Sequence, residues 1–126
     1  MTRRTKIAIA LVIAVVVITT AYGAYRVFRS GFWKGPDAMF GDQHLKTAVA
    51  LIELYRTRHN EYPATLNDLD FVGEWDRIAL NAVSYRANAV RTKYCVEVER
   101  GWIAKPHLDM PQEFWQGTGY DPGICR

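Results

Sequence analysis

The most apolar part of the chain is residues 7–25, which read IAIALVIAVVVITTAYGAY and carry no charged side chain. A helix over these 19 residues rises about 28 Å, close to the thickness of the hydrocarbon core of a bilayer. Because the run has no polar face, we predict one membrane-spanning helix in contact with the lipid bilayer. This predicted anchor occupies residues 1–30, and its apolar and aromatic side chains include Ile7, Leu11, Val15, Ile18, Tyr22 and Tyr25.

A cleaved secretory signal is the alternative interpretation of the same segment. Basic residues precede the apolar run, and the small residues Ala21 and Gly23 would allow cleavage before Ala24. The run is longer than the roughly 7–15 residues of a typical signal core, which favours a retained anchor. Whether residues 1–23 are removed stays open, but both interpretations place the rest of the chain outside the cytoplasm.

Apolar residues recur at helical spacing after a stretch rich in glycine. Residues 31–41 include Pro36 and three glycines, which predicts a linker or a broken helix. Asp42 then fits the N-cap of an amphipathic helix over residues 43–59. The apolar stripe of this helix consists of Leu45, Ala48, Val49, Ile52, Tyr55 and His59. Such a stripe must be buried against a sheet or another helix.

The second half of the chain changes to the alternation of a half-buried sheet. Tyr62-Pro63 ends the helical region, a short helical turn follows at residues 66–70, and a less regular stretch continues to Asn81. Residues 83–89 and 94–99 alternate apolar and polar side chains, which predicts an antiparallel hairpin. Residues 101–105 are a candidate third strand, and the tail from Asp109 shows little periodicity.

Two cysteines, Cys95 and Cys125, both lie in this second half. An even number of cysteines in a small exported domain favours a disulfide, which needs an oxidising compartment. The alternative is a pair of buried thiols. With the disulfide, the predicted fold class is α+β: a transmembrane helix, an amphipathic helix packed on a small antiparallel sheet, and a C-terminal loop closed by the disulfide.

The charge of the chain is unevenly distributed. Residues 1–30 carry five Lys or Arg and no acidic residue, whereas residues 31–126 carry 11 basic and 13 acidic residues. The folded part therefore has no basic stripe, and nucleic acid is not an expected partner. Only about 95 residues remain for folding, which excludes a large catalytic domain.

No group of residues has the spacing of a catalytic or metal site. His44 and His59 lie about 22 Å apart on the predicted helix, too far to share a metal. The acidic residues around Asp68 follow no calcium-loop pattern. We therefore expect no metal, no cofactor and no enzymatic activity. Four aromatic residues form either core or a patch that binds a partner: Trp102, Phe114, Trp115 and Tyr120.

The sequence resembles the pilins and pseudopilins of bacterial type IV pili and type II secretion systems. The resemblance rests on three segments, Leu51-Ile52-Glu53-Leu54-Tyr55-Arg56, His59-Asn60-Glu61-Tyr62-Pro63 and Leu66-Asn67-Asp68-Leu69. In that family an amphipathic helix commonly ends in a Tyr-Pro turn, and type IV pilins have a disulfide-bounded C-terminal loop. The chain lacks the family's prepilin peptidase motif, a glycine before an aromatic or apolar residue with glutamate four positions later.

The resemblance implies a pilin-like periplasmic domain over residues 42–126, held in the bacterial inner membrane with a cytoplasmic N-terminus. The expected function is a protein-interaction component of pilus or secretion machinery. Two alternatives remain open, a membrane-anchored immunity or inhibitor protein that binds an exported toxin, and a periplasmic ligand-binding domain. The sequence defines neither the partner nor the oligomeric state, nor entry into a filament.

Overall fold

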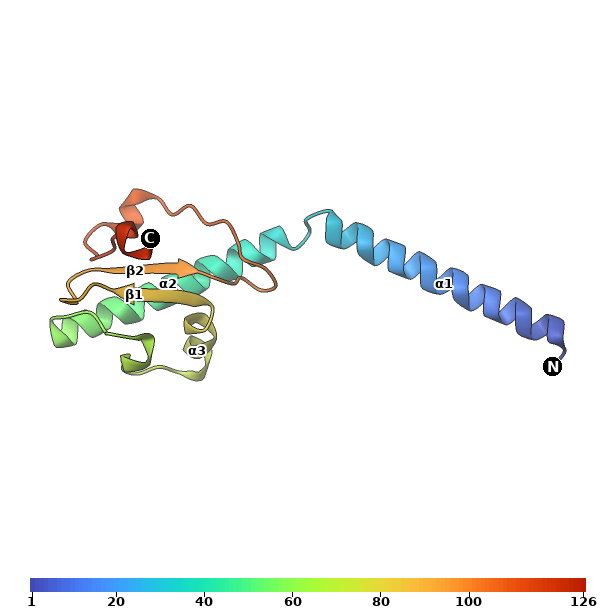
Figure 1. Ribbon diagram of the computed structural model, residues 1–126, viewed down its shortest axis with the longest axis horizontal. Helices are drawn as coiled ribbons and strands as arrows, with labels where there is room; N and C mark the ends of the chain where they lie inside the picture. The colour runs from blue at the N-terminus through green and yellow to red at the C-terminus, as the bar shows by residue number, and fades with distance from the viewer. The chain divides into compact units, whose positions relative to one another are not determined.

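The computed structural model describes residues 1–126 and divides them into two compact units, residues 1–33 and residues 34–126 (Figure 1). The first unit is one helix with the short turn that follows it. The second contains α2, α3, the hairpin β1–β2 and three short 3-10 helices.

Helix α1 spans Arg3–Arg29 and buries none of its residues within the protein. The only hydroxyls between Ile7 and Tyr22 are turned back onto the helix: Thr19 donates to the Val15 carbonyl at 2.9 Å, and Thr20 donates to the Val16 carbonyl at 2.8 Å. This one helix is long and apolar enough to cross a membrane. The apolar side chains from Ile7 to Tyr25 therefore have no protein partner that would shield them from water.

Helix α2 spans Lys34–His59, so the helix is broken only by the turn at residues 30–33. The predicted linker over residues 31–41 and the predicted cap at Asp42 are therefore wrong. Pro36 is the third helical residue, where its missing N–H removes no intrahelical bond. Asp37 holds this first turn in place, because its carboxylate accepts the amide protons of Ile103 at 2.6 Å and Ala104 at 3.1 Å. Gly41 is also needed as glycine, since a Cβ there would overlap the side chain of Pro106.

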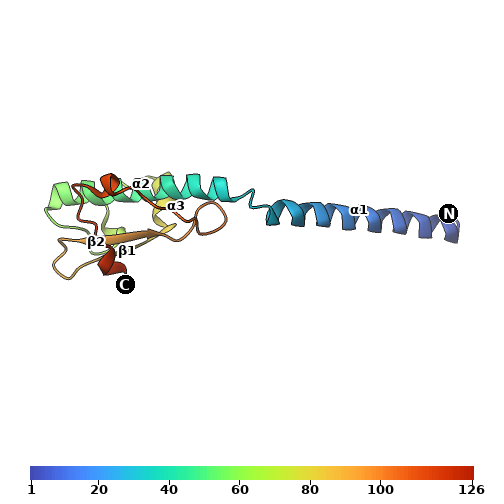
Figure 2. The same cartoon turned by 90° about the horizontal axis from the view of Figure 1, so that it is seen from above.

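Four residues of the predicted stripe of α2 belong to the core. Leu45, Ala48, Val49 and Ile52 are buried and pack with residues of the sheet, which runs beside α2 in Figure 2. The last two residues of the predicted stripe do not, since Tyr55 is half-buried and His59 is exposed. The predicted helical turn after Pro63 is confirmed as η1, Leu66–Asp68. The stretch expected to be irregular contains a further helix, α3, at Glu74–Leu80, whose start is capped by the Asp76 carboxylate on the Gly73 amide at 2.9 Å.

The antiparallel hairpin is confirmed. Strands β1, Val83–Ala87, and β2, Tyr94–Val98, pair in a register that runs from Val83 opposite Val98 to Ala87 opposite Tyr94. The turn is closed by the Asn88 side chain, which accepts the amide protons of Thr92 and Lys93. No third strand forms at residues 101–105, because these residues curl around Asp37 instead.

Two 3-10 helices complete the C-terminal region, η2 at Gln112–Trp115 and η3 at Pro122–Cys125. The predicted disulfide is present between Cys95 and Cys125. Its Cys95 end is fully buried in β2, and its other end fixes η3 against that strand. In Figure 2, α2 lies on one side of the hairpin and the C-terminal turn on the other. The fold is therefore α+β, as predicted.

Candidate protein-binding groove

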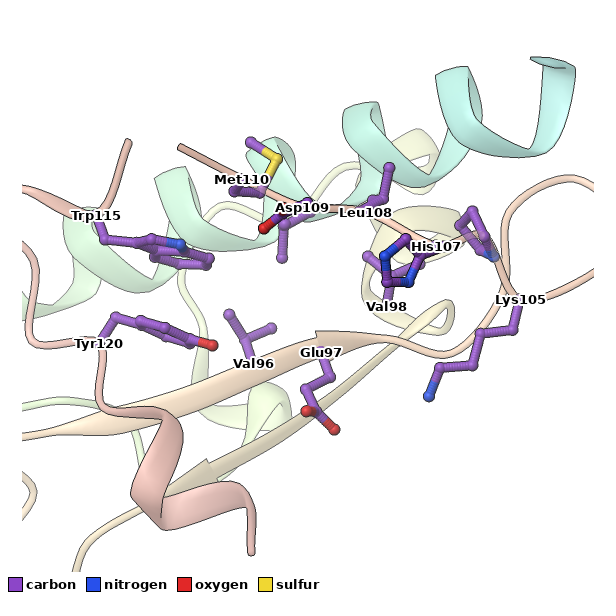
Figure 3. Close-up of a pocket in the computed structure, with 12 residues that line it drawn as sticks. Val96, Glu97, Val98, Lys105, His107, Leu108, Asp109, Met110, Trp115 and Tyr120 are labelled. Atoms are coloured by element: carbon purple, nitrogen blue, oxygen red, sulfur yellow. The ribbon is translucent and has the colours of Figure 1, made fainter. Parts of the chain in front are cut away.

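A groove runs along the edge of β2 that does not face β1 (Figure 3). One wall is β2 itself, at Val96, Glu97 and Val98. The opposite wall is the segment 105–110, and Leu45 of α2 contributes to the lining from the helix side. The cavity volume is about 340 Å³, near the lower end of the range for small-molecule sites.

Two stacked aromatic rings close one end of the groove. The rings of Trp115 and Tyr120 lie 3.7 Å apart and nearly parallel, at an interplanar angle of 14°. Phe114 meets Trp115 edge-on at 4.7 Å and packs against the core. All three are half-buried, so they serve as core on one side and as surface on the other.

The structure thus brings together three of the four predicted partner-binding residues, with Trp102 placed elsewhere. Trp102 is 54% exposed and lies 5.9 Å from Phe40 in a second hollow between α2, α3 and the loop after β2. The cavity volume of this hollow is about 560 Å³. Its lining includes Trp75 and His44. Burial, followed by the positive charge of Arg100, lowers the pKa of His44.

The charged groups of the groove lie at its mouth. Glu97, Lys105, His107 and Asp109 are exposed, whereas Val96, Val98, Leu108 and Met110 point inward or are half-buried. Lys105 reaches Glu99 at 3.4 Å. Burial, followed by the nearby carboxylate of Glu97, raises the pKa of Tyr120, so its hydroxyl stays protonated at neutral pH. The accessible surface of the groove is therefore mostly polar, and its apolar contacts come from half-buried side chains such as Leu108 and Met110.

The residues considered as metal ligands are engaged in structural contacts. His59 stacks on Tyr55 at 4.1 Å and pairs with Asp70 at 2.9 Å. The Asp68 and Asp76 carboxylates cap the backbone at Thr65 and Gly73.

One further group of candidate ligands brings sulfur and oxygen atoms within 4.8 Å of one another, Cys95, Cys125 and Glu97. Its two sulfurs are joined as a disulfide and offer no thiolate.

The wall at residues 105–110 was not predicted, although the sequence contains a signal for it. Pro106, Leu108 and Met110 are half-buried and alternate with the exposed His107 and Asp109. This period of two indicates an extended segment with one face on the core, and it overlaps the start of the C-terminal tail at Asp109. Leu45 was predicted as core, and the structure shows that it also lines the groove.

Comparisons with known proteins add no relationship. No protein-family model matches the chain, and neither a curated protein sequence nor a solved structure matches it.

Proposed function

We propose that this chain is a single-pass protein of the bacterial inner membrane whose periplasmic domain binds another envelope protein. In this proposal it is a non-enzymatic, pilin-like or pseudopilin-like component of pilus or secretion machinery. The observation that carries the proposal is α1, a 27-residue helix whose apolar side chains the protein leaves uncovered. At about 1.5 Å per residue such a helix spans a bilayer with turns to spare.

The disulfide supports the periplasmic location. Cys95 and Cys125 are bonded, and structural disulfides persist in oxidising compartments such as the bacterial periplasm. The basic residues Arg3, Arg4 and Lys6, which precede the span, then lie on the cytoplasmic side.

The order of elements supports the pilin-like assignment. An amphipathic helix is followed by Tyr62-Pro63, then by an antiparallel hairpin and a disulfide-bounded C-terminal region. Tyr62 is 1% exposed, and its hydroxyl donates to Glu53 at 3.0 Å and accepts the Gly119 amide proton at 2.7 Å. The Tyr-Pro turn thereby joins the helix to the C-terminal loop.

The groove along β2 is the surface that we assign to the partner. Its stacked pair Trp115 and Tyr120 combines large apolar area with hydrogen-bonding groups, the composition typical of sites that dominate binding energy at protein interfaces.

Site-specific photocrosslinking in cells tests this function. A photoreactive phenylalanine analogue replaces His107, an exposed residue on the groove wall, in the full-length chain. The matched control places the same analogue at Thr92, an exposed residue of the hairpin turn that does not line the groove. We expect a crosslink to a pilus or secretion component at position 107 and none at 92.

Two results would count against the proposal. Equal crosslinking at both positions would mean that the groove is not the binding surface. A crosslink to an exported toxin at position 107 would support the immunity or inhibitor function instead.

A further inference from the structure

The hydrogen bonds of β2 show which of its residues face the groove. The Tyr94 amide donates to the Gly119 carbonyl at 3.0 Å, and the Tyr94 carbonyl accepts from the Asp121 amide at 2.8 Å. The backbone of Tyr94 therefore points away from β1. Successive residues of a strand direct their backbone N–H and C=O groups to opposite edges. The backbone groups of Val96 and Val98 therefore point to the same edge as those of Tyr94.

The bonds at the two ends of the hairpin fit the same alternation. The Asn88 amide donates to the Lys93 carbonyl at 3.0 Å, and the Glu99 amide donates to the Ala82 carbonyl at 2.8 Å. The residues of β2 between Lys93 and Glu99 that pair with β1 through the backbone are thus Cys95 and Glu97.

The outward backbone groups of Val96 and Val98 have no hydrogen-bond partner in the protein. Both residues line the groove, and they are only 2% and 7% exposed. Backbone donors and acceptors with so little access to water are rarely left unpaired, because each costs about as much as a lost hydrogen bond. The groove therefore contains two unsatisfied amides and two unsatisfied carbonyls in a row.

The chain itself begins a third strand here and then leaves it. Tyr120 forms a single parallel bridge with Tyr94. Pro122 then starts η3, and the Asp121 carboxylate caps this turn on the Gly123 amide at 2.9 Å. Cys125 is bonded to Cys95, whose side chain points to the opposite face of the sheet from Val96. The disulfide thus draws the chain off the edge after one residue pair.

We propose that an extended segment of the partner protein binds in this groove by β-strand addition, continuing the sheet along Val96 and Val98. The inference rests on the proposed function and adds the chemistry of recognition. Main-chain hydrogen bonds to Val96 and Val98 provide affinity for any extended sequence, and alternate side chains provide specificity. Leu108 and Met110, which are half-buried on the opposite wall, can contact apolar side chains of the segment, whereas Glu97, Lys105 and Asp109 at the mouth favour polar or charged ones.

The test uses full-length, ¹⁵N-labelled protein in lipid nanodiscs and a probe peptide. The probe is an octapeptide selected against this protein from a displayed random library. Two control versions of the peptide carry N-methyl groups on alternate amides, one in each of the two possible registers. Each version removes the donors along one edge and keeps every side chain. Amide hydrogen exchange is measured for Val96 and Val98, with Cys95 and Glu97 as paired references in the same strand.

We expect Val96 and Val98 to exchange at least tenfold faster than Cys95 and Glu97 in the free protein. Saturation with the peptide should slow exchange at Val96 and Val98 at least tenfold. It should leave Tyr85, on the outer edge of β1, unchanged. One of the two N-methylation registers should weaken binding at least tenfold.

Each other outcome overturns strand addition. A peptide that binds without protecting Val96 and Val98, or that tolerates N-methylation in both registers, would show recognition by side chains alone and leave the proposed function intact. Protection that rises with protein concentration and without peptide would identify a second copy as the occupant. If no library peptide binds, strand addition fails, and the crosslink at position 107 decides separately whether the proposed function stands.

Discussion

Tyr62, in the turn that follows α2, connects that helix to the C-terminal region. Its hydroxyl contacts Glu53 and Arg56 of α2 and the amide of Gly119 near the C-terminus, all within 3.1 Å. Burial, followed by the charge of Glu53, raises the pKa of Tyr62, which keeps the hydroxyl protonated as a donor. Its ring also lies 4.7 Å from that of Tyr94 in the core.

The close approach of Gly119 to this ring gives the first prediction. A Cβ at position 119 would overlap the Tyr62 ring, which is buried and cannot move without breaking its hydrogen bonds. Gly119→Ala should therefore lower the free energy of unfolding by about 1–3 kcal/mol, measured by urea denaturation of the full-length protein in detergent. The control is Gly35→Ala, where a Cβ meets no atom within 4 Å. Equal stability of the two variants would contradict the contact.

Asp37 gives a prediction with a defined pH dependence. Amide hydrogen bonds, chiefly from Ile103, lower its pKa below the ordinary value of 3.8. A carboxyl whose pKa is lowered by folding contributes stability above its unfolded pKa, and this is lost as the pH falls through the folded pKa. We therefore expect the urea concentration at the unfolding midpoint of the wild type to decrease as the pH is lowered below about 4.

The variants at position 37 separate charge from hydrogen bonding. Asp37→Asn keeps an acceptor oxygen without a charge, so its urea midpoints should fall less over the same pH range. Asp37→Ala removes the acceptor and should lower the midpoint at neutral pH as well. Identical acid dependence in the wild type and Asp37→Asn would show that Asp37 is not the group responsible, leaving Asp121, whose pKa is also lowered, as a candidate.

At the scale of elements, the sequence predicts those whose pattern arises from their own packing. The stripe from Leu45 to Ile52 repeats at helical spacing because one face of α2 covers the sheet. The hairpin alternates because one of its faces packs on α2, whereas Ser84, Arg86 and Glu97 on the other face are exposed. Cys95 is the exception on that second face, because the disulfide and η3 cover it. These signals are local and periodic, so they can be recognised without knowledge of the rest of the fold.

The wrong predictions fall where distant residues decide the local structure. Helix α2 begins at Lys34, well before the predicted Asp42, because its first turn tolerates Pro36 and the amides of Ile103 and Ala104 hold Asp37 from 66 and 67 residues away. The same contact turns residues 101–105 into a loop. Helix α3 has only seven residues, with Trp75 84% exposed, so it lacks a clear apolar stripe.

The candidate site was predicted only in part, for a related reason. Trp115 and Tyr120 can be recognised as candidates from their large aromatic side chains, which the sequence alone shows. The unpaired edge at Val96 and Val98 depends on where the chain turns away, at Pro122, and on the disulfide that holds it there. No composition or spacing predicts which strand edge remains open.

The disulfide is expected to stabilise the domain substantially. It joins residues 30 positions apart, and closing a loop of that length in the unfolded chain corresponds to about 3–4 kcal/mol. The double change Cys95→Ala/Cys125→Ala should lower the free energy of unfolding by this amount in urea denaturation. Reduction of the wild type should cause a similar loss, whereas a loss below about 1 kcal/mol in both would contradict the role of the bond.

At the scale of the whole molecule, α1 is the one helix long and apolar enough to cross a membrane. Ile13 and Val16 lie one turn apart near the middle of the helix, and both are exposed. Arginine at the centre of a span costs roughly 2.5–3.5 kcal/mol, so Ile13→Arg/Val16→Arg should release most of the chain from membranes in alkaline carbonate extraction. The control Ile13→Leu/Val16→Leu should remain embedded. Retention of both variants would indicate attachment by other means.

The most direct test of the account is thiol labelling of the full-length protein in bacterial spheroplasts. A membrane-impermeant maleimide is applied before and after an impermeant reductant, and the inner membranes are then isolated. We predict full-length protein in the membrane fraction, with Cys95 and Cys125 labelled only after reduction. Labelling without reductant, or only after the membrane is permeabilised, would contradict an oxidised domain outside the cytoplasm. A shortened soluble product would show instead that residues 1–23 are a cleaved signal.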